Sequence, residues 1–349
     1  MEAKRRLFLL LFLIFGFSGV VFSQGQIISP VGTCLSGTEL MSAAEVENIR
    51  PRMLEGMQRY FELALKSSPG YREVHWDRDN SSFAEYLESV APNRNRFRVI
   101  TGVVDERQPV DELTLLKTTA TEALVASTES YSVYNVQWPV LEGVTGQGMW
   151  VEPHTNVKAQ MVVLPDASWT PEMLMGLSQG IPAAAQFARK LASSGCRLLI
   201  PVLINRKDTW SGNPAVRMTN QPHREFIYRR AYQAGRHIVG YEVQKVLAAV
   251  DWFTKQSSDL PIAVAGYGEG GLIGLYSAAI DTRIDGALVS GYFQEREGIW
   301  KEPVYRNVWG LLKEFGDAEI AGLVAPRLLV IEACRGPEVS GPPVAAGDR

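Results

Sequence analysis

The chain has 349 residues, enough for one large domain with an extension or for two ordinary domains. Hydrophobic residues make up 46% of it and charged residues 21%, a balance typical of soluble globular proteins and not of disordered ones. The formal net charge is −3, so the composition gives no reason to expect nucleic acid as a partner, which would favour a basic surface.

The N-terminus has the pattern of a secretory signal. The basic residues 4–6 precede an apolar run over residues 7–22, which is shorter than the about 20 residues that a membrane-spanning helix needs. Val21 and Ser23 supply small side chains at the −3 and −1 positions of a cleavage site. We therefore predict that residues 1–23 are a signal peptide, in preference to an uncleaved anchor. The mature protein is then secreted or periplasmic and has no membrane span.

The next hundred residues show helical patterns. Between residues 43 and 66, apolar side chains recur at steps of three and four, which predicts a helix with a break or a later start near Pro51. A second, shorter helix is predicted over residues 83–90. Residues 24–128 are therefore interpreted as a helical N-terminal extension.

After Thr128 the pattern changes to that of a sheet. Residues 131–138 and 148–151 alternate with the period of two that is typical of half-buried strands. Short apolar runs then alternate with helical segments, which predicts a mostly parallel α/β sheet with helices on both faces, over residues 129–349. The predicted strands cover residues 160–164, 198–204, 262–265, 286–290 and 328–331, and the predicted helices residues 183–192 and 239–253.

The most informative segment reads Gly266-Tyr267-Gly268-Glu269-Gly270-Gly271 and joins a predicted strand to a predicted helix. It resembles the nucleophile elbow of the α/β-hydrolase superfamily, Gly-x-Ser-x-Gly-Gly, whose flanking positions must be small. The resemblance covers about residues 126–343. Segments 131–151, 164–169, 240–253 and 325–332 are similar to the branch that contains dienelactone hydrolases, acetyl xylan esterases and prolyl-oligopeptidase-like enzymes. This resemblance implies an α/β-hydrolase fold and an ancestry among carboxylic-ester hydrolases.

The nucleophile of that motif is absent. Gly268 stands at its position and has no side chain with which to attack a carbonyl. Shifting the motif by one residue would make Glu269 the nucleophile. This alignment is disfavoured, because Tyr267 would then occupy a flanking position that must be small. A glycine-rich dinucleotide loop is also disfavoured, because the Rossmann fingerprint follows the first strand of its unit and this turn lies much deeper in the chain.

The resemblance also implies positions for the rest of the machinery. The catalytic acid is expected after the strand that ends at Glu332, which could instead pair with Arg327 or Arg335. Backbone donors of an oxyanion hole are expected at the amide of Glu269 and near Asp166 or Ala167. The catalytic histidine should follow the acid, yet every histidine precedes Gly268: His75, His154, His223 and His237.

Two explanations for the incomplete triad stay open. The chain could stop before the last strand and helix of the fold, or the protein could have lost catalysis and kept the fold for binding. Truncation does not account for Gly268, which favours the loss of catalysis. We therefore predict an exported, esterase-like protein that is inactive as given. The alternatives are a non-catalytic protein that binds carbohydrates or anions, or serves as a scaffold, and an active hydrolase with an unrecognised nucleophile.

A basic connection follows the strand predicted over residues 198–204. Its arginines could hold carboxylates or phosphates, and a tryptophan there could stack on a sugar ring. The favoured alternative is a salt-bridged lid, in which acidic residues neutralise the arginines. The candidate ligand-binding residues are Arg206, Trp210, Arg224 and Arg229, and the candidate neutralising residues are Asp208, Glu225 and Glu242.

Metal ions and cofactors are not expected. No two histidines have a ligand spacing such as i, i+4, and no two cysteines lie close together in the sequence. The candidate partner is a small-molecule or carbohydrate ligand.

Overall fold

The computed structural model describes residues 37, 39–118, 122–208, 221–339 and 341. Contacts within the chain divide it into two compact units, residues 1–61 and 62–349. The boundary falls inside a long helix, α2 (Ala43–Arg72), and each unit is described by itself. The predicted signal peptide lies outside the described residues. Within the described residues, no helix has the length and apolar character that crossing a membrane requires.

The described helix of the first unit is the N-terminal part of α2, up to Phe61, whose side chains are almost all exposed. Pro51 lies within the helix, so the predicted break or later start near this residue is wrong. Proline removes one helical N–H bond, and the carbonyl that loses its partner belongs to Glu47. Because Glu47 is exposed, water can replace the missing donor, and the helix continues.

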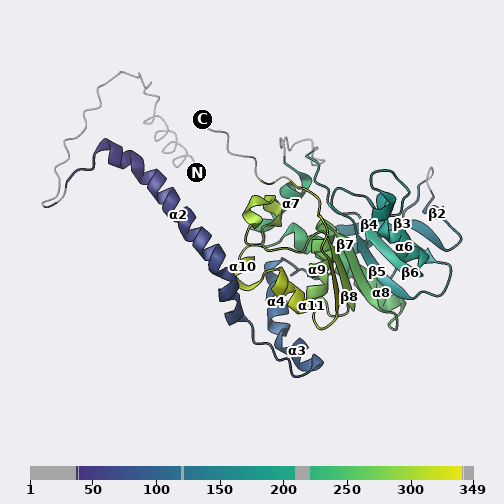
Figure 1. Cartoon of the computed structure of the whole chain (residues 1–349). Coiled ribbons are helices and arrows are strands. Elements are labelled where there is room, and N and C mark those ends of the chain that lie inside the picture. The colour runs from purple at the N-terminus through teal and green to yellow at the C-terminus, as the bar shows by residue number, and fades with distance from the viewer. Residues whose placement is uncertain (1–36, 38, 119–121, 209–220, 340, 342–349) are drawn as a thin grey trace, which may run out of the picture. The chain divides into compact units, whose positions relative to one another are not determined.

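The second unit is built on a single sheet (Figure 1), in which the described residues form nine strands. Their order is β1-β3-β4-β6-β5-β7-β8-β9, and β2 also pairs with β3. The run from β6 to β9 is parallel, whereas β3 and β4 pair antiparallel with their neighbours. The strands are β1 (Thr114–Leu115), β2 (Leu124–Ser127), β3 (Tyr131–Leu141), β4 (Val144–Pro153), β5 (Ala159–Leu164), β6 (Cys196–Pro201), β7 (Ile262–Tyr267), β8 (Gly286–Ser290) and β9 (Leu328–Glu332).

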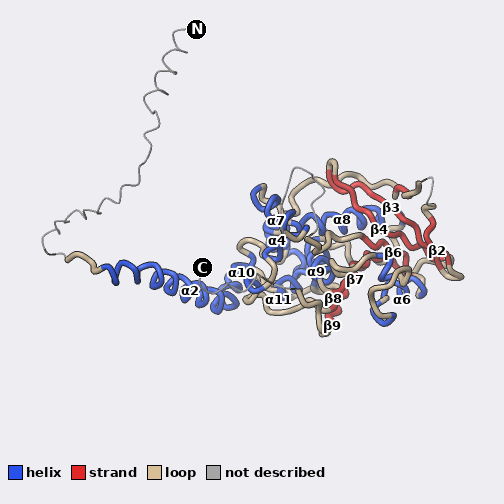
Figure 2. The backbone as a smooth tube through the Cα atoms, turned by 90° about the horizontal axis from the view of Figure 1, so that it is seen from above, coloured by secondary structure: helices blue, strands red, loops and turns tan. Residues whose placement is uncertain are grey.

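Helices cover both faces of this sheet, as Figure 2 shows from above. On one face α8 and α9 contact β5, and on the other α6 contacts β4 and β6. Side chains of β5 alternate to match: Val162 and Leu164 pack in the core of the first face, and Val163 in that of the second. The predicted mostly parallel α/β sheet is therefore confirmed. The α-helices are α3 (Phe83–Ser89), α4 (Ala91–Ile100), α5 (Pro171–Leu174), α6 (Phe187–Ser193), α7 (His223–Gln233), α8 (Ile238–Gln256), α9 (Glu269–Ile280), α10 (Leu311–Glu314) and α11 (Asp317–Val324).

Several local details differ from the sequence-based expectations. β1 and β2 precede residue 129 and pair with β3, so strands of the sheet begin within the segment predicted as a helical extension. The helix predicted over residues 183–192 is a 3-10 turn followed by α6, because the backbone of Gln186 leaves the helical region with ψ of 56°. β6 ends at Pro201 instead of residue 204.

The last strand of the sheet is poorly covered. Leu328 and Val330 of β9 are 66% and 43% exposed, and Leu288, the neighbour of Val330 in β8, is 38% exposed. Strands of a parallel sheet are normally buried on both faces. Residues of β5, β7, β8 and α6 line a cavity of about 730 Å³ on this side of the sheet. The face of β9 and β8 that carries these side chains is therefore an apolar surface without a covering helix among the described residues, whereas α11 contacts β9 and Leu329 packs against the core of the other face.

Candidate functional site at the strand-to-helix turn

The turn between β7 and α9 has the strained shape that an elbow requires. Gly268 adopts φ 57° and ψ −118°, a region that side chains rarely occupy, and its N–H donates to the carbonyl of Ser290 at 2.9 Å. A Cβ atom on Gly266 would lie 2.2 Å from the carbonyl oxygen of Gly270. A Cβ atom on Gly270 would lie 2.3 Å from the carbonyl oxygen of Leu164. Strand and helix thus approach so closely that both flanking positions need glycine.

The space beside Gly268 is filled. A Cβ atom built on Gly268 would lie 2.6 Å from Oδ2 of Asp166 and 2.7 Å from Cγ of Pro337. Pro337 belongs to the segment after β9, and Asp166 to the loop after β5. A nucleophilic side chain at position 268 would therefore collide with two other parts of the protein.

The expected oxyanion donor already has a partner inside the protein. The N–H of Glu269, the first residue of α9, donates to Oδ2 of Asp166 at 3.1 Å. Helix N-termini favour anions, because free N–H groups and the helix dipole point at them. The Asp166 carboxylate, which is 1% exposed, thus binds the backbone donor at which an oxyanion hole is expected from the sequence. The adjacent Ala167 is also buried, and the amide of Ser168 donates to Oδ1 of Asp166 at 2.9 Å.

Arg206 holds this carboxylate in place. Both of its terminal nitrogens bind Asp166, the Nη2–Oδ2 distance being 2.8 Å, and Nη2 also lies 3.0 Å from Oε2 of Glu269. Its Nε donates to the hydroxyl of Tyr305 at 3.1 Å. Burial alone would raise the pKa of Asp166, but the hydrogen bonds and charge of Arg206 outweigh it and lower the pKa. Asp166 is therefore a permanent carboxylate near neutral pH.

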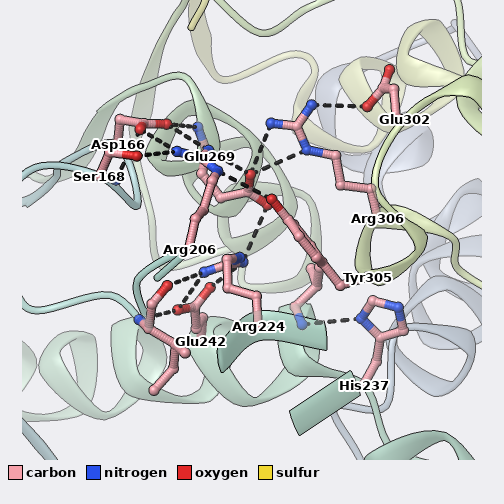
Figure 3. A network of polar contacts seen from close by, with 12 residues as sticks. Asp166, Ser168, Arg206, Arg224, His237, Glu242, Glu269, Glu302, Tyr305 and Arg306 are labelled. Atoms are coloured by element: carbon pink, nitrogen blue, oxygen red, sulfur yellow. Dashed lines mark hydrogen bonds and ion pairs between the residues drawn. The ribbon is translucent and has the colours of Figure 1, made fainter. Parts of the chain in front are cut away.

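Glu269 connects three arginines (Figure 3). Its side chain is fully buried, and it lies 2.8 Å from Nη2 of Arg306 and 3.1 Å from Nη2 of Arg224, in addition to Arg206. Burial by itself raises the pKa of Glu269, but Arg224, Arg306 and Arg206 together lower it to about 2. Charge-assisted hydrogen bonds of this kind are the strong ones, so Glu269 is a structural anchor and is not poised to exchange a proton.

Arg224 is equally enclosed. It is fully buried and binds Glu242 of α8 through both terminal nitrogens, at 3.0 and 2.8 Å. Oε1 of Glu242 also accepts from the amide of Ile204 at 2.9 Å. The acidic partners of the arginines thus come from inside the fold, which gives Arg224 no surface with which to meet a ligand.

The basic connection therefore contains ion pairs of the kind that the salt-bridged alternative expects, with different partners in part. Glu242 pairs with Arg224, and Glu225 pairs with the more exposed Arg229, as the sequence suggests. Asp166 and Glu269 are the partners that sequence reasoning missed for this cluster. Trp210 lies outside the described residues.

The predicted catalytic acid takes part in a different contact. Glu332 ends β9 and accepts a hydrogen bond from the hydroxyl of Ser290. The alternative, a pair with Arg327 or Arg335, is not what the structure shows: Arg327 donates to backbone carbonyls, and Arg335 pairs with Glu338. Glu332 thus lies at the strand ends, with a hydroxyl as its partner.

Among the histidines named above, His237 has a structural role. His237 caps α8, because its Nδ1 accepts from the amide of Val239 at 3.0 Å, and its Nε2 lies 3.0 Å from the carbonyl oxygen of Asn307. Burial lowers the pKa of His237 to about 4, so the ring is neutral at pH 7. Both ring nitrogens are therefore engaged by the backbone, and neither can act as a general base.

The cavity of about 730 Å³ described above is lined by Gly266 and Tyr267 of the turn, and two further cavities lie near the turn and its arginines. One of about 260 Å³ is lined by Gly268, Arg306 and Pro337 among others. A second of about 550 Å³ is lined by Arg206, Arg229 and Tyr305 among others. Among the described residues, no group of three histidine, cysteine or acidic side chains is placed to hold a metal ion.

Comparison with known proteins shows the fold. No protein-family model matches this chain, and no curated protein matches its sequence. A candidate acetyl xylan esterase from Bacteroides fragilis superposes with a TM-score of 0.55 at 12% identity, over 77% of this chain and 73% of that one. A CE15 glucuronoyl esterase from Teredinibacter turnerae superposes with a TM-score of 0.46 at 13% identity, over 72% of this chain and 68% of that one. The first similarity, with the sheet order above, shows an α/β-hydrolase-like fold, and at this identity it shows the fold alone.

Proposed function

We propose that this chain, which has an α/β-hydrolase-like fold, is an exported, non-catalytic relative of carboxylic-ester hydrolases whose former reaction centre has become part of the structural core. The observation that carries the proposal is the Asp166 carboxylate on the amide of Glu269, beside a Gly268 that has no room for a side chain. Ester hydrolysis at this turn needs a nucleophile and an unoccupied oxyanion donor. Here the first is missing and the second is bound within the protein.

The charges around the turn support the same proposal. Catalytic acids and bases need pKa values near the working pH, so that they can exchange protons. The carboxylate of Glu269 has a pKa of about 2 and His237 one of about 4. Neither group changes its protonation state near neutral pH, which is the behaviour of structural residues.

The test is an assay of the purified chain with short activated esters and with a fluorophosphonate probe. We expect hydrolysis no faster than the buffer background and no covalent labelling. Because a misfolded sample would also be inactive, circular dichroism and a cooperative unfolding transition must first show a folded protein. Stoichiometric labelling of any residue, located by mass spectrometry, would contradict the proposal and identify an unrecognised nucleophile.

A second candidate function is the binding of a small anion, such as a sugar acid, in the 550 Å³ cavity. Arg206 and Arg229 both line this cavity, and Arg229 is the more exposed of the two, with 56% of its side chain accessible. Guanidinium groups suit carboxylates because they offer parallel N–H donors. Glu225 also lines the cavity and is already paired with Arg229, so a ligand would have to compete with this exposed ion pair.

Thermal unfolding in the presence of uronates, sulfated sugars and phosphates tests this second candidate. A ligand that binds only the folded state and is present at a concentration of about 100 times its Kd adds about 2.7 kcal/mol to the free energy of unfolding. The change Arg229→Gln should abolish the shift. The matched control is Arg230→Gln, which alters the neighbouring arginine that packs on Phe226 and does not line the cavity. The absence of any shift across the panel would leave the ion pairs with a structural role only.

A further inference from the structure

The N-terminal part of α2 carries an apolar stripe that has no cover within its unit. The stripe consists of Val46, Ile49, Met53, Met57 and Tyr60, which are between 36% and 68% exposed. At 100° per residue these side chains fall within an arc of about 80°. α2 spans 30 residues, and in proteins most of the stability of a helix comes from packing of its apolar side, so we expect the stripe to have a packing partner.

The spacing of the stripe fits a coiled coil better than a wide globular interface. Val46, Met53 and Tyr60 occupy successive a positions of a heptad, and Ile49 occupies the d position between the first two. Gly56 stands at the second d position, where Met57 next to it can fill the space. A narrow a/d stripe is the pattern by which one helix pairs with another helix like itself.

The charges beside the stripe select the orientation of such a pair. In a parallel dimer, the g position of one helix faces the following e position of the other, which places Glu45 beside Arg50 of a second copy, twice by symmetry. In an antiparallel dimer centred on Arg52, the two copies of Arg52 would face each other. The same antiparallel arrangement would pair Glu45 with Arg59, which already binds Glu55 within its own helix at 3.3 Å.

We propose that this protein forms a homodimer through a parallel two-stranded coiled coil of the α2 stripe, with Glu45 and Arg50 as the interchain pair. The occupant of the stripe is thus a second copy of the same helix. The interface uses residues 45–60 only, all of which belong to the first unit.

The first test is the mass of the purified chain by sedimentation velocity and light scattering, at concentrations up to about 100 µM, where weak pairs with micromolar Kd associate. We expect a dimer, and Met53→Glu should shift it to monomer. The matched control is Leu54→Glu, which makes the same change at the adjacent residue. Leu54 is 69% exposed and lies off the stripe, so this variant should remain dimeric. Because both side chains are exposed, both variants should keep the wild-type unfolding temperature of the second unit.

The second test concerns the register. In a background with Cys34→Ser and Cys334→Ser, Ile49→Cys should form an interchain disulfide quickly under mild oxidation, because identical d positions meet in a parallel dimer. Leu54→Cys, at a b position, should cross-link at least ten times more slowly. The charge reversal Glu45→Arg should weaken the dimer, and the double change Glu45→Arg with Arg50→Glu should restore it.

Three results would overturn the proposal. These are a monomer throughout the concentration range, equal cross-linking of the two cysteine variants, and a dimer that survives Met53→Glu but dissociates on Val330→Asp. The last result would assign the interface to the exposed strand β9 instead.

Discussion

Glu269 and Asp317 are two buried carboxylates in equivalent positions with opposite properties. Each is the first residue of a helix, α9 and α11 respectively, and each is at most 3% exposed. Burial by itself would raise the pKa of both carboxyl groups. The net result differs: the pKa of Glu269 is lowered to about 2, whereas that of Asp317 is raised to about 6. The same kind of position therefore gives an anchored anion in one place and a titrating acid in the other.

The arginines explain the difference. Three guanidinium groups lie within 3.1 Å of the Glu269 carboxylate. The nearest guanidinium nitrogen to Asp317, Nε of Arg296, is 4.0 Å away, and Arg296 has no hydrogen-bond partner for its three nitrogens among the described residues. Asp317 accepts hydrogen bonds from the hydroxyl of Tyr292 and the amide of Gln294 at 3.1 and 3.2 Å. Burial is thus decisive only where direct contact with a counter-charge is missing.

The largest expected effect is that of Glu269→Gln. The change leaves the buried Arg224 and Arg306 and the partly buried Arg206 with one fewer negative charge, and breaking a buried ion pair typically costs about 3 to 5 kcal/mol. Urea unfolding should show this loss as a lower midpoint with an unchanged slope. The matched control, Glu225→Gln, removes the partner of Arg229 in a pair that is partly exposed, which should cost at most about 1 kcal/mol. Equal effects of the two changes would show that the buried network contributes no more than a surface pair.

Gly268→Ala tests the steric part of the site. The new methyl group meets Asp166 and Pro337 in a backbone conformation that disfavours side chains, so strain and overpacking should together cost about 2 to 4 kcal/mol. Gly235→Ala is the control, because Gly235 also has a positive φ, 65°, but nothing within 4 Å of the added Cβ atom. That variant should lose only about 1 kcal/mol, the cost of the backbone conformation alone. Gly268→Ser should be destabilised like Gly268→Ala and should not acquire esterase activity.

The pH dependence of stability separates the two acids. Because the folded-state pKa of Asp317, about 6, exceeds its ordinary value of 3.8, the folded state binds this proton more tightly than the unfolded state. The contribution of this bound proton to the free energy of unfolding is fully present below pH 4 and is lost as the pH rises through 6. Its total is about 3 kcal/mol. Asp317→Asn should remove this slope from the stability curve between pH 4 and 6, whereas the exposed-site control Asp259→Asn should keep it. Glu269 has the opposite sign, because its contribution is present above pH 4.5 and is lost as the pH falls toward 2.

The smallest expected effect concerns a buried base. Lys245 of α8 is 3% exposed, and its Nζ donates to the carbonyl oxygen of Val202 at 2.8 Å. Burial lowers the pKa of Lys245 to about 8, so the charged form destabilises the folded state below that pH. Lys245→Met should therefore stabilise the protein by about 1 to 3 kcal/mol at pH 7, and the gain should shrink as the pH rises from 8 to 10.5. Lys255→Met, at an exposed position of the same helix, should change stability little at any of these pH values.

The fold could be predicted from the sequence because its signals are local. The apolar runs of β5 and β7 and the glycines at positions 266 and 270 each depend on a few neighbouring residues. Pro51 shows the limit of such rules. A proline usually ends a helix, but the exposed surroundings of α2 allow water to take the place of the lost backbone donor.

The candidate site could be predicted only in its backbone. The sequence by itself determined the glycine turn, with a glycine at position 268, and the pair between Glu225 and Arg229, which are one helical turn apart. Only the tertiary structure decided that Asp166 binds the amide of Glu269, 103 positions further along the chain, and that Arg206 bridges the two carboxylates. The physical reason is that partners on different strand ends meet only when the sheet has formed, and no local spacing records which acid a given arginine will reach.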